Sequence, residues 1–425
     1  MAAVQRAPAV IPVFIWAPEE EAPWPPGAAS RWWLHQSLNR LRESLAARGS
    51  RLIIRRGPTR QTLASLIAET GANALFYNRR HEPAVVARDA AIALPGVTIE
   101  PFDSALLFHI ERPFQVFSAF WRACLNQPPP SPPLGAPRTI AAPDRWPESL
   151  SIDDLRLEPT VDWAGGLRST WQPGEAAATA ELDRFIESQL SAYATMRDRP
   201  AHRGTSRLSP HLHFGEISPR QVWHAVQQAR GAQSPEPIEA YLRELGWREF
   251  AYHLLIHFPH SADQPLRPEF ARFPWRIDRR LLESWRRGRT GYPLVDAGMR
   301  ELWATGWMHN RVRMIVASFL VKHLLIPWQE GTAWFWDTLV DADLANNTLG
   351  WQWTAGCGAD AAPYFRIFNP ARQSERFDPA GEYVRRWVPE ISGPDYPRPI
   401  VDHATARREA LEAFEKMRRL AGSAK

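Results

Sequence analysis

The chain has 425 residues, of which 44% are hydrophobic and 23% charged, which fits a globular protein of two or three domains with a large core. Only two cysteines occur, Cys124 and Cys357, so the composition excludes a disulfide framework and we expect a reducing, cytoplasmic location. The formal net charge of +5 favours an anionic partner without identifying one, and the 20 tryptophans call for an explanation.

The first predicted element is a buried strand at residues 9–16. The apolar run Ala7–Ala17 resembles the core of a signal peptide, but it is too short to span a bilayer, and acidic residues follow it instead of a cleavage site. Further short apolar runs occur at 52–55, 73–77 and 97–100 and alternate with helical patterns. This alternation predicts a parallel α/β sheet.

Three helical patterns separate these strands, at about 30–48, 60–70 and 81–94, and we expect Ser30 to cap the first. The amino-acid composition then changes over residues 126–175, where five prolines fall close together: Pro128, Pro129, Pro130, Pro132 and Pro133. Because proline continues neither a helix nor a central strand, this segment is predicted to be an extended connector on the surface. A disordered linker is the alternative interpretation.

The remainder of the chain is predicted to be helical, with amphipathic patterns at about 176–196, 219–230, 236–257, 279–286, 293–305, 308–325, 331–340 and 403–420. The mixed charges of the last helix indicate a solvated face, no internal repeat is apparent, and no other stretch is apolar enough for a membrane. The chain therefore divides into an α/β domain (1–125), a proline-rich connector (126–175) and a helical domain (176–425).

The most distinctive stretch is Asp341–Pro370, DADLANNTLGWQWTAGCGADAAPYFRIFNP. Several of its residues weaken a helix, namely Asn346, Asn347, Gly350, Gly356 and Gly358. They suggest a backbone held close to a flat ligand, with amide side chains aimed at the polar edge of that ligand. The alternative is a capped helix–turn–helix with an aromatic plug.

Two further patterns suggest binding chemistry. The hydroxyls and free N–H groups of Gly204–Ser209, followed by a Ser218-Pro219 helix start, suit a phosphate, although ordinary helix caps look similar. Glu244, Trp247 and Arg248 fall on one helical face, and Asn310 and Met314 on another. Two such faces could form a pocket with an aromatic wall for a flipped pyrimidine pair, or they could be ordinary amphipathic packing.

These motifs, together with Gly291-Tyr292-Pro293, the run Trp307–Arg311 and the run Trp247–Phe250, resemble the photolyase/cryptochrome family over nearly the whole chain. The resemblance implies an N-terminal α/β antenna-type domain and a C-terminal helical FAD-binding domain. The implied activity is repair of cyclobutane pyrimidine dimers in DNA by electron transfer from light-excited, reduced FAD. The sequences of these motifs are most similar to those of the bacterial (class III) photolyase branch near the plant cryptochromes.

Site residues are carried over position by position. The resemblance implies FAD contacts by Tyr193, Thr205, Ser206, Leu208, Ser209, Arg248, Arg313, Asp341, Asp343 and Asn347. Arg313 and Asp341 match an ion pair beside the isoalloxazine ring, and Asn347 matches the residue facing flavin N5. Trp351, Trp328 and Trp275 match an electron-hopping chain from the flavin to the surface.

The lesion pocket is implied in the same way. Trp247 and Trp353 match stacking walls, Glu244 and Asn310 thymine contacts, Met314 the floor, and Arg311 a DNA-phosphate contact. Glu244 would also stabilise the dimer radical anion. Photolyases for (6-4) photoproducts carry histidines at the positions of Asn310 and Met314, so a cyclobutane dimer is the expected lesion.

The main alternative function is a cryptochrome-type photoreceptor that signals through a partner. Asn347 opposes it, because plant cryptochromes typically carry Asp there. The expected partner is DNA containing pyrimidine dimers, bound by a monomer without a metal. A second, antenna chromophore could be a folate or a deazaflavin. Family members open with a strand inside the sheet that is not found here, so we expect a misassigned start, with a truncation or a rearranged sheet as the alternatives.

Overall fold

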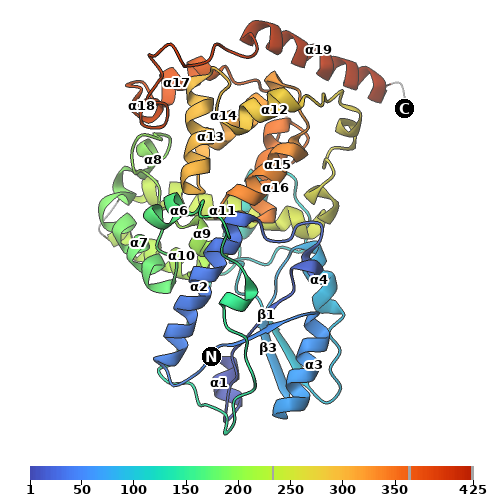
Figure 1. Cartoon of the computed structure of the whole chain (residues 1–425), viewed down its shortest axis with the longest axis vertical. Coiled ribbons are helices and arrows are strands. Elements are labelled where there is room, and N and C mark those ends of the chain that lie inside the picture. The colour runs from blue at the N-terminus through green and yellow to red at the C-terminus, as the bar shows by residue number, and fades with distance from the viewer. Residues whose placement is uncertain (232–233, 362–364, 423–425) are drawn as a thin grey trace.

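The computed structural model describes residues 1–231, 234–361 and 365–422. The α/β part lies at one end of the molecule and the helical part at the other, and α2 (Ala28–Ala46) runs along both (Figure 1). Residues 362–364 of the distinctive segment lie outside the described residues. In the described ranges, none of the helices is long and apolar enough to cross a membrane.

The four expected strands are present, but they form two sheets instead of one. β1 (Val13–Trp16) pairs in parallel with β2 (Ile53–Arg56), and β3 (Ala74–Asn78) pairs in parallel with β4 (Thr98–Phe102). The expectation of a single sheet was therefore wrong for the described residues. No backbone hydrogen bonds join the two pairs, although both pairs lie in the same region of the fold (Figure 1).

The helices of this part of the chain are α1 (Ala2–Arg6), η1 (Pro18–Glu21), α2, α3 (Thr59–Thr70) and α4 (Pro83–Ala90), and α5 (Phe117–Leu125) follows and packs in the core of the helical part. The expected cap of α2 at Ser30 was wrong, because the helix begins earlier, with Gly27 as N-cap. Asp337 accepts the Ala28 N–H at 2.8 Å, and a Cβ at Gly27 would lie 2.2 Å from the Trp336 carbonyl oxygen. Docking against the helical part thus determines where α2 starts.

The proline-rich connector is ordered, which contradicts the disordered-linker alternative. It contains η2 (Asp153–Leu155) and α6 (Gly165–Thr170). Three of its apolar side chains are buried in the core of the α/β part together with Trp16: Ile152, Leu155 and Leu157. Further along, the buried Trp171 packs against Trp33 with ring centroids 5.5 Å apart. Burial of these apolar side chains fixes the backbone of the connector against the rest of the protein.

The helical part contains α7 (Glu175–Ser188), η3 (Leu190–Ala192), α8 (Tyr193–Met196), α9 (Ser209–His213), α10 (Pro219–Gln228), η4 (Ala229–Gly231), α11 (Pro235–His257), η5 (Pro259–Ala262), η6 (Pro268–Arg272), α12 (Arg279–Arg286), α13 (Pro293–Thr305), α14 (Asn310–Ser318), α15 (Trp328–Thr338), α16 (Leu344–Ala355), α17 (Pro370–Phe377), α18 (Glu382–Trp387) and α19 (His403–Gly422). Two expected helices differ. The pattern at 176–196 breaks after Ser188, and the pattern at 308–325 continues after α14 as a π-helical turn, Phe319–His323.

Residues Leu344–Ala355 of the distinctive segment form a regular helix, α16, although several of them have weak helix propensity. Asp343 caps its start by accepting the Asn346 N–H at 2.8 Å, and Gly356, at φ 91°, ends it in the left-handed conformation. Buried side chains such as Trp351 anchor α16 between its neighbours. Tertiary packing therefore outweighs the unfavourable propensities of Asn346, Asn347 and Gly350.

Candidate functional site

Asp343 lies at the centre of a buried polar cluster at the start of α16. Besides capping the helix, its carboxylate accepts a hydrogen bond from the Tyr252 hydroxyl and lies 3.7 Å from Nδ1 of His213. Burial alone would raise the pKa of Asp343, but the hydrogen bonds from His213 and Tyr252 and the charge of Arg248 bring this pKa well below its usual value. Asp343 is therefore a fixed negative charge.

Arg248 belongs to this cluster, as predicted for a cofactor residue. Its guanidinium lies over the ring of Tyr252 at 4.7 Å and donates to the Ala105 carbonyl at 2.6 Å. The neighbouring Glu249 is buried and accepts the N–H of Leu107 at 2.8 Å. Burial raises the pKa of Glu249 to about 7. α11 is thus joined through polar contacts to the segment that leads into α5.

Arg313 and Asp341 form the predicted ion pair. Nη2 of Arg313 lies 2.8 and 3.1 Å from the two carboxylate oxygens of Asp341, whose side chain is 3% exposed. Nε of Arg313 donates to the Met308 carbonyl at 2.7 Å, which fixes the guanidinium at the first turn of α14. The pair places a half-buried positive charge beside the start of α16.

Asn347 has a fixed side-chain orientation. Its Nδ2 donates to the carbonyl oxygen of Thr332 in α15 at 3.1 Å, so its Oδ1 is the end that can accept from a ligand. Gly350 lies one turn further along α16 on the same side, and a Cβ there would meet no atom within 4 Å. The helix therefore offers an amide oxygen beside an open patch of backbone.

The hydroxyl-bearing loop Gly204–Ser209 has a constrained backbone. Arg207 adopts φ 53°, in the left-handed region, and a Cβ at Gly204 would lie 2.5 Å from the Met196 carbonyl oxygen. The Arg207 guanidinium lies 5.0 Å from the ring centre of Trp171 and 4.5 Å from that of Trp307. These two indoles hold the strained residue in place.

The other predicted phosphate-loop residues also lie close together. The Tyr241 hydroxyl donates to Oγ of Ser206 at 3.0 Å, and Tyr193 packs edge-on against Tyr241 at 5.2 Å. Leu208 is buried, and Thr205 is half-buried with its hydroxyl on the same loop. Just beyond, Ser218 caps α10 in the expected way, in a capping box with Gln221.

Trp307 connects the loop to the ion pair. Its Nε1 donates to Oγ of Ser209 at 3.4 Å, and its ring lies 4.5 Å from Arg207 and 5.9 Å from Arg313. A hydroxyl-rich loop suited to phosphate thus adjoins the half-buried guanidinium of Arg313, near an ionised carboxylate and an oriented amide. This donor and acceptor set fits the pyrophosphate, ribityl chain and ring edge of a flavin dinucleotide.

The three predicted electron-transfer tryptophans range from buried to half-buried. Trp351 is 2% exposed and Trp328 1%, whereas Trp275 is half-buried. Trp351 packs closely, because a Cβ at Gly331 would lie 2.0 Å from its ring. Trp285, which the sequence did not single out, packs edge-on against Trp351 at 6.1 Å. Electron transfer along the predicted series stays a prediction.

The predicted lesion-pocket residues of α11 and α14 are held by two adjacent residues of another segment. Arg197 binds Glu244 at 2.6 Å, and Asp198 binds Arg311 at 2.8 Å. Two other predicted residues, Asn310 and Met314, lie at the start of α14: Asn310 is exposed, and Sδ of Met314 lies 3.7 Å from Arg311. The two faces that the sequence predicted to form a pocket are thus linked by the residues that follow α8.

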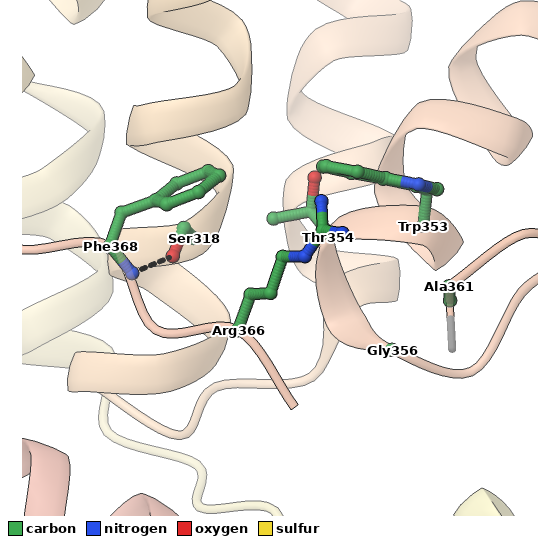
Figure 2. Close-up of a pocket in the computed structure, with 7 residues that line it drawn as sticks. All are labelled: Ser318, Trp353, Thr354, Gly356, Ala361, Arg366 and Phe368. Carbon is green, nitrogen blue, oxygen red and sulfur yellow. Dashed lines mark hydrogen bonds between the residues drawn. The ribbon is translucent and has the colours of Figure 1, made fainter. Parts of the chain in front are cut away.

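The two predicted stacking walls differ in their surroundings. Trp247 lies flat on Phe117, with ring centres 3.7 Å apart and an angle of 6°. Trp353 lines a small pocket together with Ser318 and Phe368, and the Arg366 guanidinium lies 5.5 Å from its ring (Figure 2). The sequence did not predict a role for either Phe117 or Arg366. Phe117 lies 130 positions before Trp247 in the chain, and Arg366 lies in the distinctive segment without belonging to one of its matched positions.

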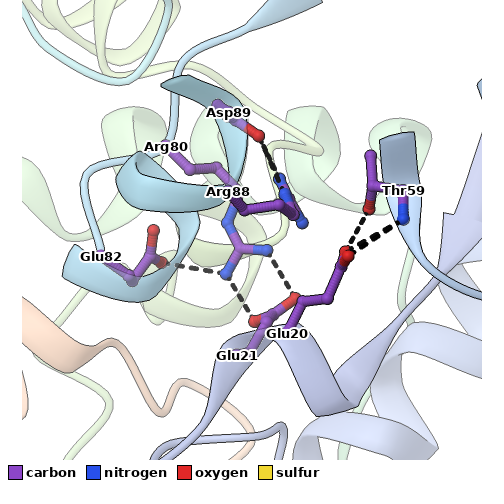
Figure 3. A network of polar contacts seen from close by, with 7 residues as sticks. All are labelled: Glu20, Glu21, Thr59, Arg80, Glu82, Arg88 and Asp89. Carbon is purple, nitrogen blue, oxygen red and sulfur yellow. Dashed lines mark hydrogen bonds and ion pairs between the residues drawn. The ribbon is translucent and has the colours of Figure 1, made fainter. Parts of the chain in front are cut away.

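A second cavity lies where the α/β part meets the helical part. It measures about 530 Å³, and its walls include Trp24 and Trp336, whose rings meet edge-on at 5.7 Å. Arg80 closes one side through ion pairs to Glu21 at 2.9 Å and to Glu82 at 3.2 Å (Figure 3). The cavity combines aromatic walls with a fixed guanidinium.

The fold and site define a two-part protein, with a parallel α/β part and a helical part built to hold a flavin dinucleotide. Comparison with known proteins agrees with this class. The family described as DNA photolyase matches residues 1–138, and the FAD binding domain of DNA photolyase matches residues 241–394. The chain belongs to the photolyase/cryptochrome family.

Individual relatives cover nearly the whole chain. A deoxyribodipyrimidine photo-lyase of Agrobacterium fabrum is 44% identical, over 99% of this chain and 95% of its own. Cryptochrome-1 of Arabidopsis thaliana is 39% identical, over 98% of this chain and 68% of its own. Among solved structures, a class III photolyase from Agrobacterium tumefaciens superposes with a TM-score of 0.94 at 44% identity, covering 98% of this chain and 94% of that one. The predicted family and its class III branch are thereby confirmed.

Proposed function

We propose that this protein is a deoxyribodipyrimidine photo-lyase that repairs cyclobutane pyrimidine dimers in DNA under light. The observation that carries the proposal is the Arg313–Asp341 pair and Asn347 within the matched FAD-binding domain, with the Gly204–Ser209 loop joined to that pair through Trp307. Bound FAD supplies the light-absorbing redox group of this reaction. The relatives named photo-lyases support the same activity.

The protein groups have separate tasks toward FAD. Ser206, Ser209 and the N–H groups of their loop would bind the pyrophosphate, since hydroxyls and N–H donors near helix starts suit phosphate. The carboxylate of Asp343 would accept from a ribityl hydroxyl. Oδ1 of Asn347 would accept from the ring N–H that only a reduced flavin carries, and Arg313 would balance negative charge on the ring. Together these groups favour the reduced cofactor.

Toward DNA, we assign stacking on the dimer to Trp247 and Trp353, and phosphate contacts to Arg311 and Arg366. Trp247 already has one face on Phe117, so it would offer its other face to a base. Glu244 now binds Arg197, and contact with a thymine requires that pair to open. The proposed pocket therefore has aromatic walls, and the polar residues Glu244 and Arg311 are positioned by ion pairs.

The decisive test is repair of a dimer-containing oligonucleotide by the FAD-loaded, reduced protein in light and in darkness. We expect dimers to disappear only in light, and a Glu244→Gln variant to bind the dimer while repairing fewer dimers per absorbed photon. A cryptochrome-type photoreceptor is the second candidate, favoured by the 39% identity to Arabidopsis cryptochrome-1. Flavin photoreduction without any repair would favour that candidate.

We assign the cavity between Trp24 and Trp336 to a second, antenna chromophore with a flat ring system, such as a folate or a deazaflavin. A solved archaeal relative from Sulfolobus tokodaii, at TM-score 0.84 and 29% identity, is described with two FAD molecules and a novel light-harvesting cofactor. Trp336→Ala should lower the content of the second chromophore in the purified protein and leave FAD content unchanged. Equal loss of both, or of neither, would contradict this assignment.

A further inference from the structure

An exposed tryptophan on α13 is left unused by the site described above. Trp303 is 65% exposed, more than any other tryptophan in the described residues, and Trp163 follows with 41%. An exposed indole costs solvation free energy that a polar residue would avoid. Its neighbours suggest a use for it.

The ring of Trp303 belongs to a stacked platform. It lies parallel to Trp334 of α15, with ring centres 5.9 Å apart and an angle of 5°. The Arg286 guanidinium, at the end of α12, lies 5.0 Å from the centre of the Trp334 ring and also binds Glu330 at 3.2 Å. Trp334, half-buried and held from α12, gives Trp303 a firm support, so the exposed ring is a rigid flat surface.

Positive charge lies along α12, next to this platform. Residues 279–289 contain five arginines and one glutamate, and Glu283 pairs with Arg287. Arg279, Arg280 and Arg289 are exposed and form no ion pair with any of the described residues. Arg279 lies two turns before Arg286 on the same side of α12, which is the side that reaches Trp334. Arg279 therefore lies on the side of α12 that faces the platform.

A flat aromatic surface beside unpaired arginines fits one ligand class well. Single-stranded nucleic acid presents both free base faces, which stack on indoles, and phosphates, which bind guanidinium groups. Duplex DNA hides its base faces, and an acidic peptide would use the arginines but not the ring. We propose that Trp303, with the arginines of residues 279–289, binds single-stranded nucleic acid at a site separate from the lesion pocket on α11 and α14.

The test measures binding of a fluorescent, dimer-free oligothymidylate to the full chain with FAD in darkness, at two salt concentrations. Trp303→Ala should weaken binding about fivefold to a hundredfold, the range for loss of one stacked base, and Trp303→Phe should retain most of the affinity. Trp163→Ala is the matched control and should bind like the wild type. Arg279→Gln should reduce the salt dependence, whereas Arg407→Gln on α19 should not.

The possible outcomes separate this site from the lesion pocket. If Trp303→Ala binds the oligothymidylate like the wild type, the proposal is wrong. If Trp247→Ala alone weakens binding, the strand enters the lesion pocket, which overturns this proposal and supports the proposed function. If polyglutamate displaces the oligothymidylate and binds with the same dependence on Trp303, the partner is an acidic protein and not a nucleic acid. Dimer repair by Trp303→Ala should equal that of the wild type.

Discussion

His309 gives the protein a specific weakness toward acid. Its side chain is 2% exposed, and its Nδ1 accepts the Arg311 N–H at 3.2 Å, which caps α14. Burial, with smaller contributions from the charges of Arg311 and Arg313, lowers the pKa of His309 from 6.5 to about 4, against an opposing effect of Asp198. The folded protein therefore keeps the imidazole neutral at pH values where the unfolded chain protonates it.

The size of the effect follows from the two pKa values. Between pH 6.5 and about pH 4 the unfolded state binds more protons, so the free energy of unfolding falls as the pH is lowered through this window. The full loss is about 3 kcal/mol, and about 2 kcal/mol of it should appear between roughly pH 7.5 and 5. His309→Asn removes this proton uptake and keeps a short acceptor at the N-cap of α14.

Urea unfolding of the wild type and His309→Asn at about pH 7.5 and 5 tests this reasoning. The stability of the variant relative to the wild type should rise by about 2 kcal/mol at the lower pH, because all other titrating groups are shared and cancel in the difference. His202→Asn, which changes an exposed histidine, is the control and should follow the wild type. Parallel pH dependences for His309→Asn and the wild type would refute a buried neutral imidazole.

Three further predictions concern the site. Trp247→Ala should lower the preference for dimer-containing over intact DNA about fivefold to a hundredfold, from a stacking loss of about 1–3 kcal/mol per base, as measured by binding isotherms. Trp275→Phe should slow light-driven flavin reduction, yet repair by chemically pre-reduced protein should match the wild type; unchanged photoreduction would exclude this residue from the donor series. Arg313→Leu leaves the buried Asp341 carboxylate unpaired and should lower stability by roughly 3–5 kcal/mol in urea unfolding, and Asp341→Asn in the same chain should recover part of that loss.

Local signals in the sequence located many helices well. α12 and α13 begin and end where the pattern placed them: Asp278 caps α12, Pro293 starts α13, and Gly306 at φ 67° ends it. Such boundaries depend on residues within one turn, which a sequence shows directly. The start of α2 was mislocated because its first N–H binds Asp337, more than 300 positions away in the chain. Partners at such separations leave no local pattern.

In the site, too, local motifs could be predicted from the sequence and distant contacts could not. Motifs placed Arg313, Asp341 and Asn347 together, and the structure brings them to one end of α16. What the motifs could not supply was the set of partners that orient them. The carbonyl of Thr332 turns the Asn347 amide, and Phe117 supports Trp247 from a helix 130 positions earlier. Backbone carbonyls and distant apolar rings carry no signature of their own in a sequence.

One short helix, α8, connects the predicted cofactor residues with the predicted lesion residues. α8 begins with Tyr193, which packs against the Tyr241 that binds Ser206, and the two residues after its end bind Glu244 and Arg311. A shift of α8 would therefore move the phosphate loop and both ion pairs of the lesion face together. Since these ion pairs hold α11 and α14 in register, the geometry of the proposed pocket depends on how the cofactor loop is seated. Cofactor binding and lesion binding should accordingly be coupled through residues that contact neither the flavin ring nor the dimer.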